Sequence, residues 1–245
     1  MRPVLFEWRG LTIWSYPAML YTGLVAGVVA GNLSAHAMGI DAFHVFVATL
    51  ILIIPALVGA RLLYVAAHWQ HYRKTPRRIW SRREGGSDMY GGFLLALLLA
   101  LPALRSLQLG FGAFWDVSMI TILTGMIFAR LGCLLNGCCA GRPSRAWISL
   151  YLPNHLGIWT RRFPTQYLEA GWAGALLVCA LAIRRSMPFP GALALVMAAG
   201  YSSGRLLLES LRESERGASR FTHNHAISMV TVAFAVVTLI IFWPR

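Results

Sequence analysis

FHVFVATLILIIPALVGARLLYVAA, residues 43–67, is the stretch of the sequence that decides the fold. Arg61 is its only side chain with a full charge at neutral pH. The hydrocarbon core of a bilayer is roughly 30 Å thick, and an α-helix needs about 20 mainly apolar residues to cross it. The stretch therefore predicts a transmembrane helix.

Six further apolar segments surround it, at 13–33, 89–104, 113–135, 168–183, 190–208 and 225–243. Of the 245 residues, 57% are hydrophobic and 13% are charged, whereas about 25% of the residues of a soluble domain are charged. A soluble fold of this length could not bury so much apolar surface. We therefore predict an all-α integral membrane protein of about seven transmembrane helices. It forms a single membrane domain over 1–245, with a small extramembrane loop region at 136–167.

The first apolar segment has an alternative interpretation as a secretory signal peptide. Ala35-His36-Ala37 resembles a cleavage site. However, the apolar run of about 21 residues is longer than the core of an ordinary signal peptide. We therefore expect a transmembrane helix here.

The net charge of +13 is concentrated on one side of the predicted bundle. The N-terminal tail and the loops at 68–88, 136–167 and 209–224 hold fifteen of the 22 Lys and Arg residues, and the opposite side holds four. A basic face suits anionic lipid headgroups. The positive-inside rule would instead make it the cytoplasmic side. No soluble domain presents this charge, so nucleic acid is not an expected partner.

Three of the four cysteines, Cys133, Cys138 and Cys139, fall in one short stretch. Their C-x4-C-C spacing is not a standard zinc pattern. Small thiols that pack a glycine-rich turn are the simpler interpretation. We therefore expect neither a metal nor an organic cofactor.

Arg61, Arg130 and Arg205 lie within or at the ends of predicted helices. Arginine at membrane depth is costly and marks function or a buried partner. Helical spacing places a polar set on one face near Arg205, namely Tyr201, Arg205, Glu209 and Arg212. An Arg205–Glu209 ion pair that serves structure alone is the alternative. Three such arginines beside a basic face favour a pocket for a phosphate-bearing lipid.

Two groups of glycines have different interpretations. Gly91 and Gly92 begin the third apolar segment, where glycine would let the backbone approach an anionic ligand. Glycines at every fourth position of the first segment indicate close helix packing in a membrane, namely Gly23, Gly27 and Gly31.

Several motifs, in order along the chain, resemble those of the prolipoprotein diacylglyceryl transferase family. ARLGCLLNGCCAGRP at 129–143 is similar to the family signature, and FPTQYLEA at 163–170 to its Pro-Thr-Gln motif. Tyr201 to Arg212 resembles a late Tyr/Arg/Glu/Arg helix, and 89–92 resembles a His-Gly-Gly turn. Tyr16 falls where the family has an early tyrosine. Together the matches span roughly 13–230.

The resemblance implies transfer of diacylglyceryl from phosphatidylglycerol to the lipobox cysteine of a prolipoprotein signal peptide, with release of glycerol phosphate. The expected partners are phosphatidylglycerol, the lipobox and membrane lipids. The implied catalytic residues are Arg130, Arg205, Tyr90 and Glu209. The implied substrate-binding residues are Tyr16, Gly91, Gly92, Cys133, Asn136, Gly141, Gln166, Tyr201 and Arg212.

Three positions depart from the family pattern. Tyr90 replaces a histidine that is a proposed base, Cys133 replaces an asparagine and Cys138 replaces a glutamate. His223 and His225 are alternative bases. These departures leave room for a transferase of the same fold with another acceptor or reaction, or for a non-catalytic lipid-binding or transport protein.

The resemblance also implies a location and an orientation. It places the protein in the bacterial inner membrane, as a multi-pass protein whose active face points outward. Positive-inside would turn the same basic face toward the cytoplasm. We adopt the outward orientation, because cations around an anionic-lipid site have a functional reason to be there.

Overall fold

In the computed structural model, the described part of the chain contains seven long helices. The structure describes residues 4–8, 11–73, 75–80, 86, 88–154, 157–213 and 223–243. The long helices are α1 (Ser15–Ala37), α2 (Ala42–Ala67), α4 (Met89–Ser106), α5 (Phe111–Asn136), α6 (Thr165–Ile183), α7 (Ala192–Glu209) and α8 (His223–Phe242). A short α3 (Trp69–Tyr72) and a 3₁₀ turn (Pro76–Trp80) follow α2.

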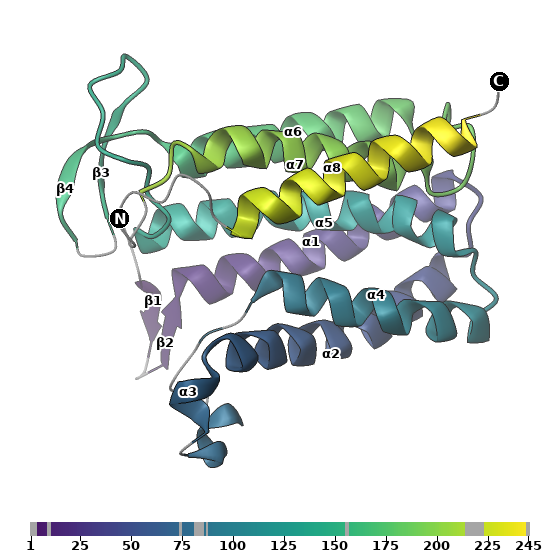
Figure 1. Cartoon of the computed structure of the whole chain (residues 1–245), viewed down its shortest axis with the longest axis horizontal. Coiled ribbons are helices and arrows are strands. Elements are labelled where there is room, and N and C mark those ends of the chain that lie inside the picture. Colours follow the sequence, from purple (N-terminus) through teal and green to yellow (C-terminus); the bar gives the residue numbers. More distant parts are fainter. Residues whose placement is uncertain are drawn as a thin grey trace.

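Each predicted apolar segment corresponds to one long helix, so the fold class is confirmed. The long helices lie side by side along one direction (Figure 1). Since each runs opposite to the one before it, one end of the bundle gathers the first residues of α1, α4, α6 and α8 and the last residues of α2, α5 and α7. We call this the loop-rich end, because it also carries the β-strands and α3 (Figure 1).

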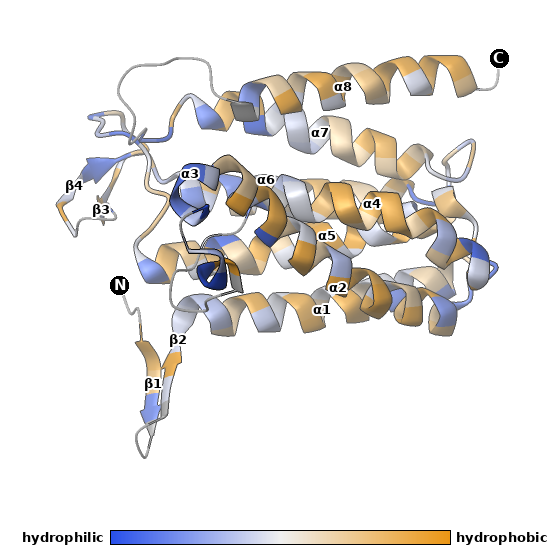
Figure 2. Ribbon diagram, turned by 60° about the horizontal axis from the view of Figure 1, so that its bottom comes forward, coloured by the Kyte–Doolittle hydropathy of each residue, from blue (hydrophilic) through white to orange (hydrophobic). Residues whose placement is uncertain are grey.

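The outer surface of the bundle is apolar. Leu57, Val178 and Ile240 are 68%, 68% and 73% exposed. Hydrophobic residues run along the helices, and hydrophilic residues gather in the turns and on the strand β4 (Trp159–Arg162) (Figure 2). By length and composition, five of the described helices could cross a membrane: α1, α2, α5, α6 and α8. The apolar part of α4, Tyr90–Ser106, is shorter. These features are those of a multi-pass membrane protein.

Glycines bring two pairs of helices together. A Cβ on Gly23 would lie 2.8 Å from Cβ of Phe128, and one on Gly27 would lie 2.6 Å from the carbonyl oxygen of Thr121, so α1 packs closely along α5. The packing role predicted for the α1 glycines is therefore confirmed. In the second pair, Gly59 of α2 faces Gly91 of α4, with no room for a side chain on either.

The interior consists of buried apolar clusters, each of which forms where three helices meet. One buried apolar cluster joins α5, α6 and α7 and consists of Ile120, Leu123, Leu176, Ala180, Leu193 and Met197. At the end of the bundle opposite the loops, the buried carboxylate of Asp116 in α5 accepts hydrogen bonds from the backbone N–H groups of Gly191 (2.7 Å) and Ala194 (2.8 Å). This carboxylate caps α7 from a neighbouring helix and so fixes the position of α7 against α5.

Two small antiparallel hairpins lie at the loop-rich end. β1 (Val4–Trp8) pairs with β2 (Leu11–Trp14), and β3 (Leu150–Pro153) pairs with β4 (Trp159–Arg162). The region 136–167, predicted from the sequence only as a loop, therefore contains the hairpin of β3 and β4. Arg162 is 2% exposed and pairs with Glu213 at 2.7 Å, which joins the second hairpin to the chain after α7.

Candidate functional site

Two arginines from different helices share one carboxylate near the loop-rich end. Nε of Arg130, in the last turns of α5, lies 2.5 Å from Oε2 of Glu169 in α6. Nη1 of Arg205 in α7 lies 3.4 Å from the same oxygen. The three side chains are 13%, 7% and 13% exposed. Three helices thus meet through buried charges, which costs free energy unless each charge is paired.

The chain of charges continues along α7. Nη2 of Arg205 lies 3.0 Å from Oε2 of Glu209, and Nη1 of Arg212 lies 3.7 Å from the same atom. We call Arg130, Glu169, Arg205, Glu209 and Arg212 the arginine–glutamate cluster. Its three arginines and two glutamates carry a formal net charge of +1. A cluster with one excess positive charge, largely out of water, is suited to bind an anion.

Two tyrosines lie beside this cluster. The hydroxyl of Tyr201, one turn before Arg205, is within hydrogen-bonding reach of Arg130. Tyr90, in the first turn of α4, interacts electrostatically with Arg205, Tyr201 and Glu209. The cluster therefore faces phenol groups from two helices, which can donate hydrogen bonds to an anionic oxygen.

A largely apolar cavity of about 510 Å³ begins at these residues. Tyr90, Tyr201 and Arg205 line its polar part, and α2, α4, α5, α7 and α8 supply the other walls. Along α5 the lining runs from Met126 to Trp115, about 16 Å at 1.5 Å per residue. A polar group held by Arg205 would thus have apolar space beside it for a hydrocarbon chain.

A cysteine-containing turn follows α5 on the same end of the bundle. The amide of Gln166, at the start of α6, donates to the carbonyl of Cys138 (2.8 Å), and the hydroxyl of Thr165 donates to the carbonyl of Cys139 (2.9 Å). Tyr16 lies close enough to the three thiols and Arg130 to interact with them. Asn136, the exposed last residue of α5, contacts Cys138. Gln166 therefore positions this turn directly.

The thiol of Cys139 lies in an unusual electrostatic environment. Hydrogen bonds from the thiols of Cys133 and Cys138, aided by the positive charges of Arg212 and Arg130, hold the pKa of Cys139 well below its usual range. Cys139 is therefore the most acidic thiol of the turn, and its thiolate is the form that binds metals and reacts with electrophiles.

Gly141 lies beside the cluster, where three segments of the chain pass close to one another. It forms a β-bridge with Arg212, and a Cβ at this position would collide with the backbone of Phe163. The chain after α5 thus runs directly against both the chain after α7 and the start of α6. Only glycine permits this approach.

The structure gives other residues a different role from the one suggested by the sequence. Gly91 and Gly92 pack α4 against the backbone of α2, and the N–H of Gly91 points to the side chain of Asp88 at 3.4 Å, although Gly92 also lines the cavity. Arg61 donates to the carbonyls of Ile79 (2.6 Å) and Gly86 (2.8 Å). It ties the segment after α3 to α2.

Two histidines at the start of α8 are the alternative candidate bases. His225 lies in the first turns of α8 and is partly buried. The side chain of His223 lies outside the described residues. Tyr90 is the sequence-predicted base that lines the cavity beside Arg205.

Glu169 is the residue of the cluster that sequence reasoning missed as a site residue. It links Arg130 to Arg205 and is 6% exposed. A signal was present in the sequence, because an acidic residue stands inside an apolar segment three residues after Gln166. A carboxylate at membrane depth requires a cationic partner, and buried arginines were already predicted.

The chain matches the sequence model of the family described as "Prolipoprotein diacylglyceryl transferase" over residues 3–241. Relatives named phosphatidylglycerol–prolipoprotein diacylglyceryl transferase are 25% identical in Clostridium tetani (96% of this chain, 96% of the relative) and 27% identical in Synechococcus elongatus (97% and 86%). The relative from Halalkalibacterium halodurans is 29% identical (99% and 86%). The similarity therefore covers almost the whole length of both proteins.

Proposed function

The chain belongs to the prolipoprotein diacylglyceryl transferase family, and we propose that the arginine–glutamate cluster and the adjoining cavity are where it transfers diacylglyceryl from phosphatidylglycerol to a prolipoprotein. The observation that supports this site best is that Arg205 lines the cavity and shares Glu169 with Arg130. A phosphate at the cluster and acyl chains in the cavity would match the two halves of the lipid.

The reaction exchanges one bond for another. The thiolate of the prolipoprotein lipobox cysteine attacks the glycerol carbon that carries the phosphate, forming a C–S bond. The C–O bond breaks, its electron pair stays on the phosphate oxygen, and glycerol phosphate leaves. The thiol proton passes to a base, and negative charge grows on the leaving phosphate.

The cluster is suited to stabilise this growing charge. Arg130 and Arg205 are held in place before the substrate arrives, so little reorganisation is needed during the reaction. Their guanidinium groups can bind phosphate oxygens in pairs. Glu169 and Glu209 orient the arginines and leave one positive charge in excess.

Tyr90 is the residue we assign to the thiol proton. It lines the cavity beside Arg205, at the end where the phosphate would bind. Tyr201 and Tyr16 would line the headgroup end, and Gln166, Gly141 and Arg212 would hold the surrounding loops.

The pairing of the buried carboxylates argues against a transporter. Acidic groups at membrane depth in a transporter serve as ion sites. Here Glu169 and Glu209 are paired with arginines, and Asp116 caps α7. Each of these three carboxylates is therefore already engaged by a partner that fixes a helix.

We place the protein in the bacterial inner membrane with the loop-rich end outward. The support is functional, since this end carries the cluster, and phosphatidylglycerol is anionic. A cysteine introduced at Thr75, in a variant without other cysteines, should react with a membrane-impermeant maleimide in intact cells. Labelling at Met187 instead would mean that the loop-rich end faces the cytoplasm.

The activity test uses purified full-length protein, labelled phosphatidylglycerol and a synthetic lipobox peptide. The expected product is a thioether-linked lipopeptide, and Arg130→Ala and Arg205→Ala should each abolish its formation. Arg184→Ala is the matched control, because Arg184 lies at the opposite end and donates to the hydroxyl of Ser34 at 3.2 Å. Normal turnover of Arg205→Ala would contradict the assigned site.

A further inference from the structure

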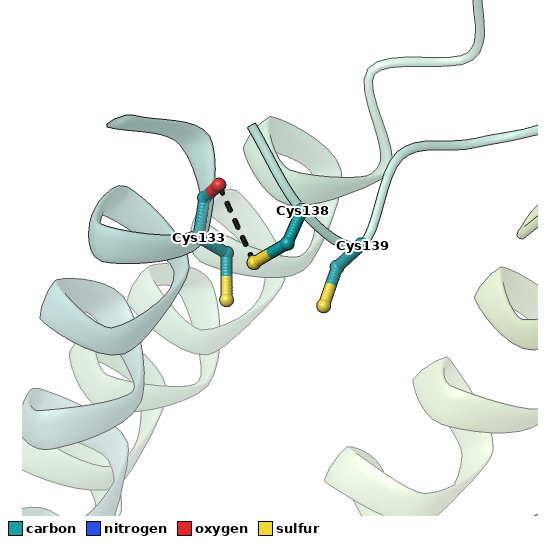
Figure 3. A group of neighbouring side chains, drawn as sticks. All are labelled: Cys133, Cys138 and Cys139. Atoms are coloured by element: carbon teal, nitrogen blue, oxygen red, sulfur yellow. Dashed lines mark hydrogen bonds between the residues drawn. The ribbon is translucent and has the colours of Figure 1, made fainter. Parts of the chain in front are cut away.

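Three cysteine thiols converge beside the arginine–glutamate cluster. The Sγ atoms of Cys133, Cys138 and Cys139 all lie within 4.8 Å of one another. Figure 3 shows the three side chains at the end of α5, with the sulfur of Cys138 lying toward Cys133, to whose carbonyl oxygen it donates at 3.7 Å. Each is a free thiol, and Cys133 is buried.

The backbone builds this convergence in two steps. Gly137 ends α5 in the left-handed region (φ 74°), so the chain reverses and the N–H of Cys138 bonds the carbonyl of Cys133 at 3.1 Å. Cys139 then also takes a left-handed conformation (φ 59°), which is uncommon for a residue other than glycine. The two reversals bring together residues whose spacing resembles no standard zinc motif.

The turn is also held in place by the start of α6. Thr165 and Gln166 bind the carbonyls of Cys139 and Cys138, as described above. Oε1 of Gln166 is buried and has no hydrogen-bond partner among the described residues. The side chain that binds the turn therefore keeps an unused electron-pair donor, where a fully paired structural turn would leave none.

We propose that Cys133, Cys138 and Cys139 form a binding site for a soft divalent cation of the zinc type. Thiolates select such ions over magnesium or calcium. At a Zn–S distance of about 2.3 Å, two sulfurs on a tetrahedral ion lie about 3.8 Å apart, so the thiols need only a small inward movement.

The charges around the turn fit a bound ion. Three thiolates and one divalent cation together carry a charge of −1, far less negative charge than three unliganded thiolates would place beside the arginine–glutamate cluster. Arg130 and Arg212 lie near enough to Cys139 to interact electrostatically with its thiol. The ion would tie the end of α5, which carries Arg130, to the cysteine turn, and the hydrogen bonds of Thr165 and Gln166 join that turn to the start of α6, which carries Glu169. Its role would be to brace the cluster.

The test uses the reduced, chelator-treated full-length protein in detergent, without lipid or peptide substrate. Added Co²⁺ should give a thiolate-to-cobalt charge-transfer absorption at one ion per chain, and Zn²⁺ should displace it. Cys133→Ser, Cys138→Ser and Cys139→Ser should each weaken binding by roughly a hundredfold or more. Cys179→Ser is the matched control and should bind normally, because Cys179 is exposed and lies within α6.

A second measurement works even if a serine variant does not fold. In the wild-type protein, Zn²⁺ should protect three of the four thiols from maleimide, as counted by mass spectrometry. Absence of the cobalt band, equal labelling with and without Zn²⁺, or a disulfide that forms among these cysteines despite Zn²⁺ would each overturn the site. Since no lipid is present, this outcome is independent of the activity test.

Discussion

Arg130 and Arg205 are held by the same oxygen atom, because Oε2 of Glu169 lies 2.5 Å from Nε of Arg130 and 3.4 Å from Nη1 of Arg205. This carboxylate is the point at which α5, α6 and α7 meet. Without its charge, two arginines would face each other in a site that excludes most water, and their repulsion would move them apart.

The first prediction concerns this shared carboxylate. Glu169→Gln keeps the shape of the side chain but removes the charge, and breaking a buried ion pair costs about 3–5 kcal/mol. We expect a lower unfolding temperature and a large fall in kcat. Glu169→Asp, which retains the charge, should recover part of both. If Glu169→Gln changed KM for phosphatidylglycerol alone, Glu169 would not position the arginines for the reaction.

The second prediction concerns the geometry of Arg205. Arg205→Lys retains the positive charge but loses the planar fork that contacts Glu169 and Glu209 and can also bind phosphate. Removal of one preorganised group that stabilises a transition state lowers kcat by about a hundred- to a thousandfold. We expect a loss in this range from steady-state kinetics. Near-normal kcat would mean that charge alone is sufficient at this position.

The sequence predicts the seven helices because each is a run of mainly apolar residues, and this signal is local. Helix ends are less well predicted. The predicted segment at 168–183 begins three residues after the observed start of α6 at Thr165, since Thr165 and Gln166 are polar. Their side chains bind the cysteine turn, a contact that hydropathy does not encode.

The sequence predicts most residues of the site, but it predicts fewer of the contacts between them. The spacing of Arg205 and Glu209 on one helix indicates a contact, which the structure gives as 3.0 Å. The pairing of Arg130 with Glu169 depends on how α5 packs against α6, and no local pattern contains that information. The convergence of the three thiols depends likewise on the left-handed backbone at Cys139, which its residue type does not predict.

The third prediction concerns pH and lies outside the membrane-spanning segments. Asp41 caps α2, and hydrogen bonds from the backbone and ring of His44 lower its pKa. A carboxylate with a depressed pKa stabilises the fold above its unfolded pKa, and this contribution is lost as the pH falls through the folded value.

The thermal stability of wild type and Asp41→Ala should therefore differ at neutral pH and converge in acid, below about pH 4. Unfolding temperatures measured from pH 3 to pH 7 in steps of about one unit would check this. A difference that stayed constant over the whole range would mean that the ionised carboxylate contributes nothing to the cap.

The fourth prediction compares two glycines in apolar helices. A Cβ on Gly59 would collide with the carbonyl of Gly91, whereas one on Gly171 would meet nothing within 4 Å. Gly59→Ala should separate α2 from α4 and destabilise the protein by about 1–3 kcal/mol. Gly171→Ala should be neutral or stabilise it by up to about 1 kcal/mol. Equal unfolding temperatures for the two variants would exclude close α2–α4 packing as a source of stability.

The last prediction concerns Tyr90, which lines the cavity beside Arg205 where the family resemblance places a histidine. Tyr90→Phe keeps the ring and its packing but removes the hydroxyl. If that hydroxyl accepts the thiol proton, kcat should fall by about a hundred- to ten-thousandfold while the protein remains folded.

Tyr90→His tests whether residue 90 acts as a base or only donates a hydrogen bond. Histidine has a reference pKa near 6.5, closer to neutral pH than that of tyrosine, so it should retain or raise turnover if position 90 removes a proton. A hydroxyl that only donates to phosphate would instead be replaced poorly by imidazole, and both variants would lose activity. Full activity of Tyr90→Phe would exclude both roles and move the search for the base to His225, on the helix that forms another wall of the cavity.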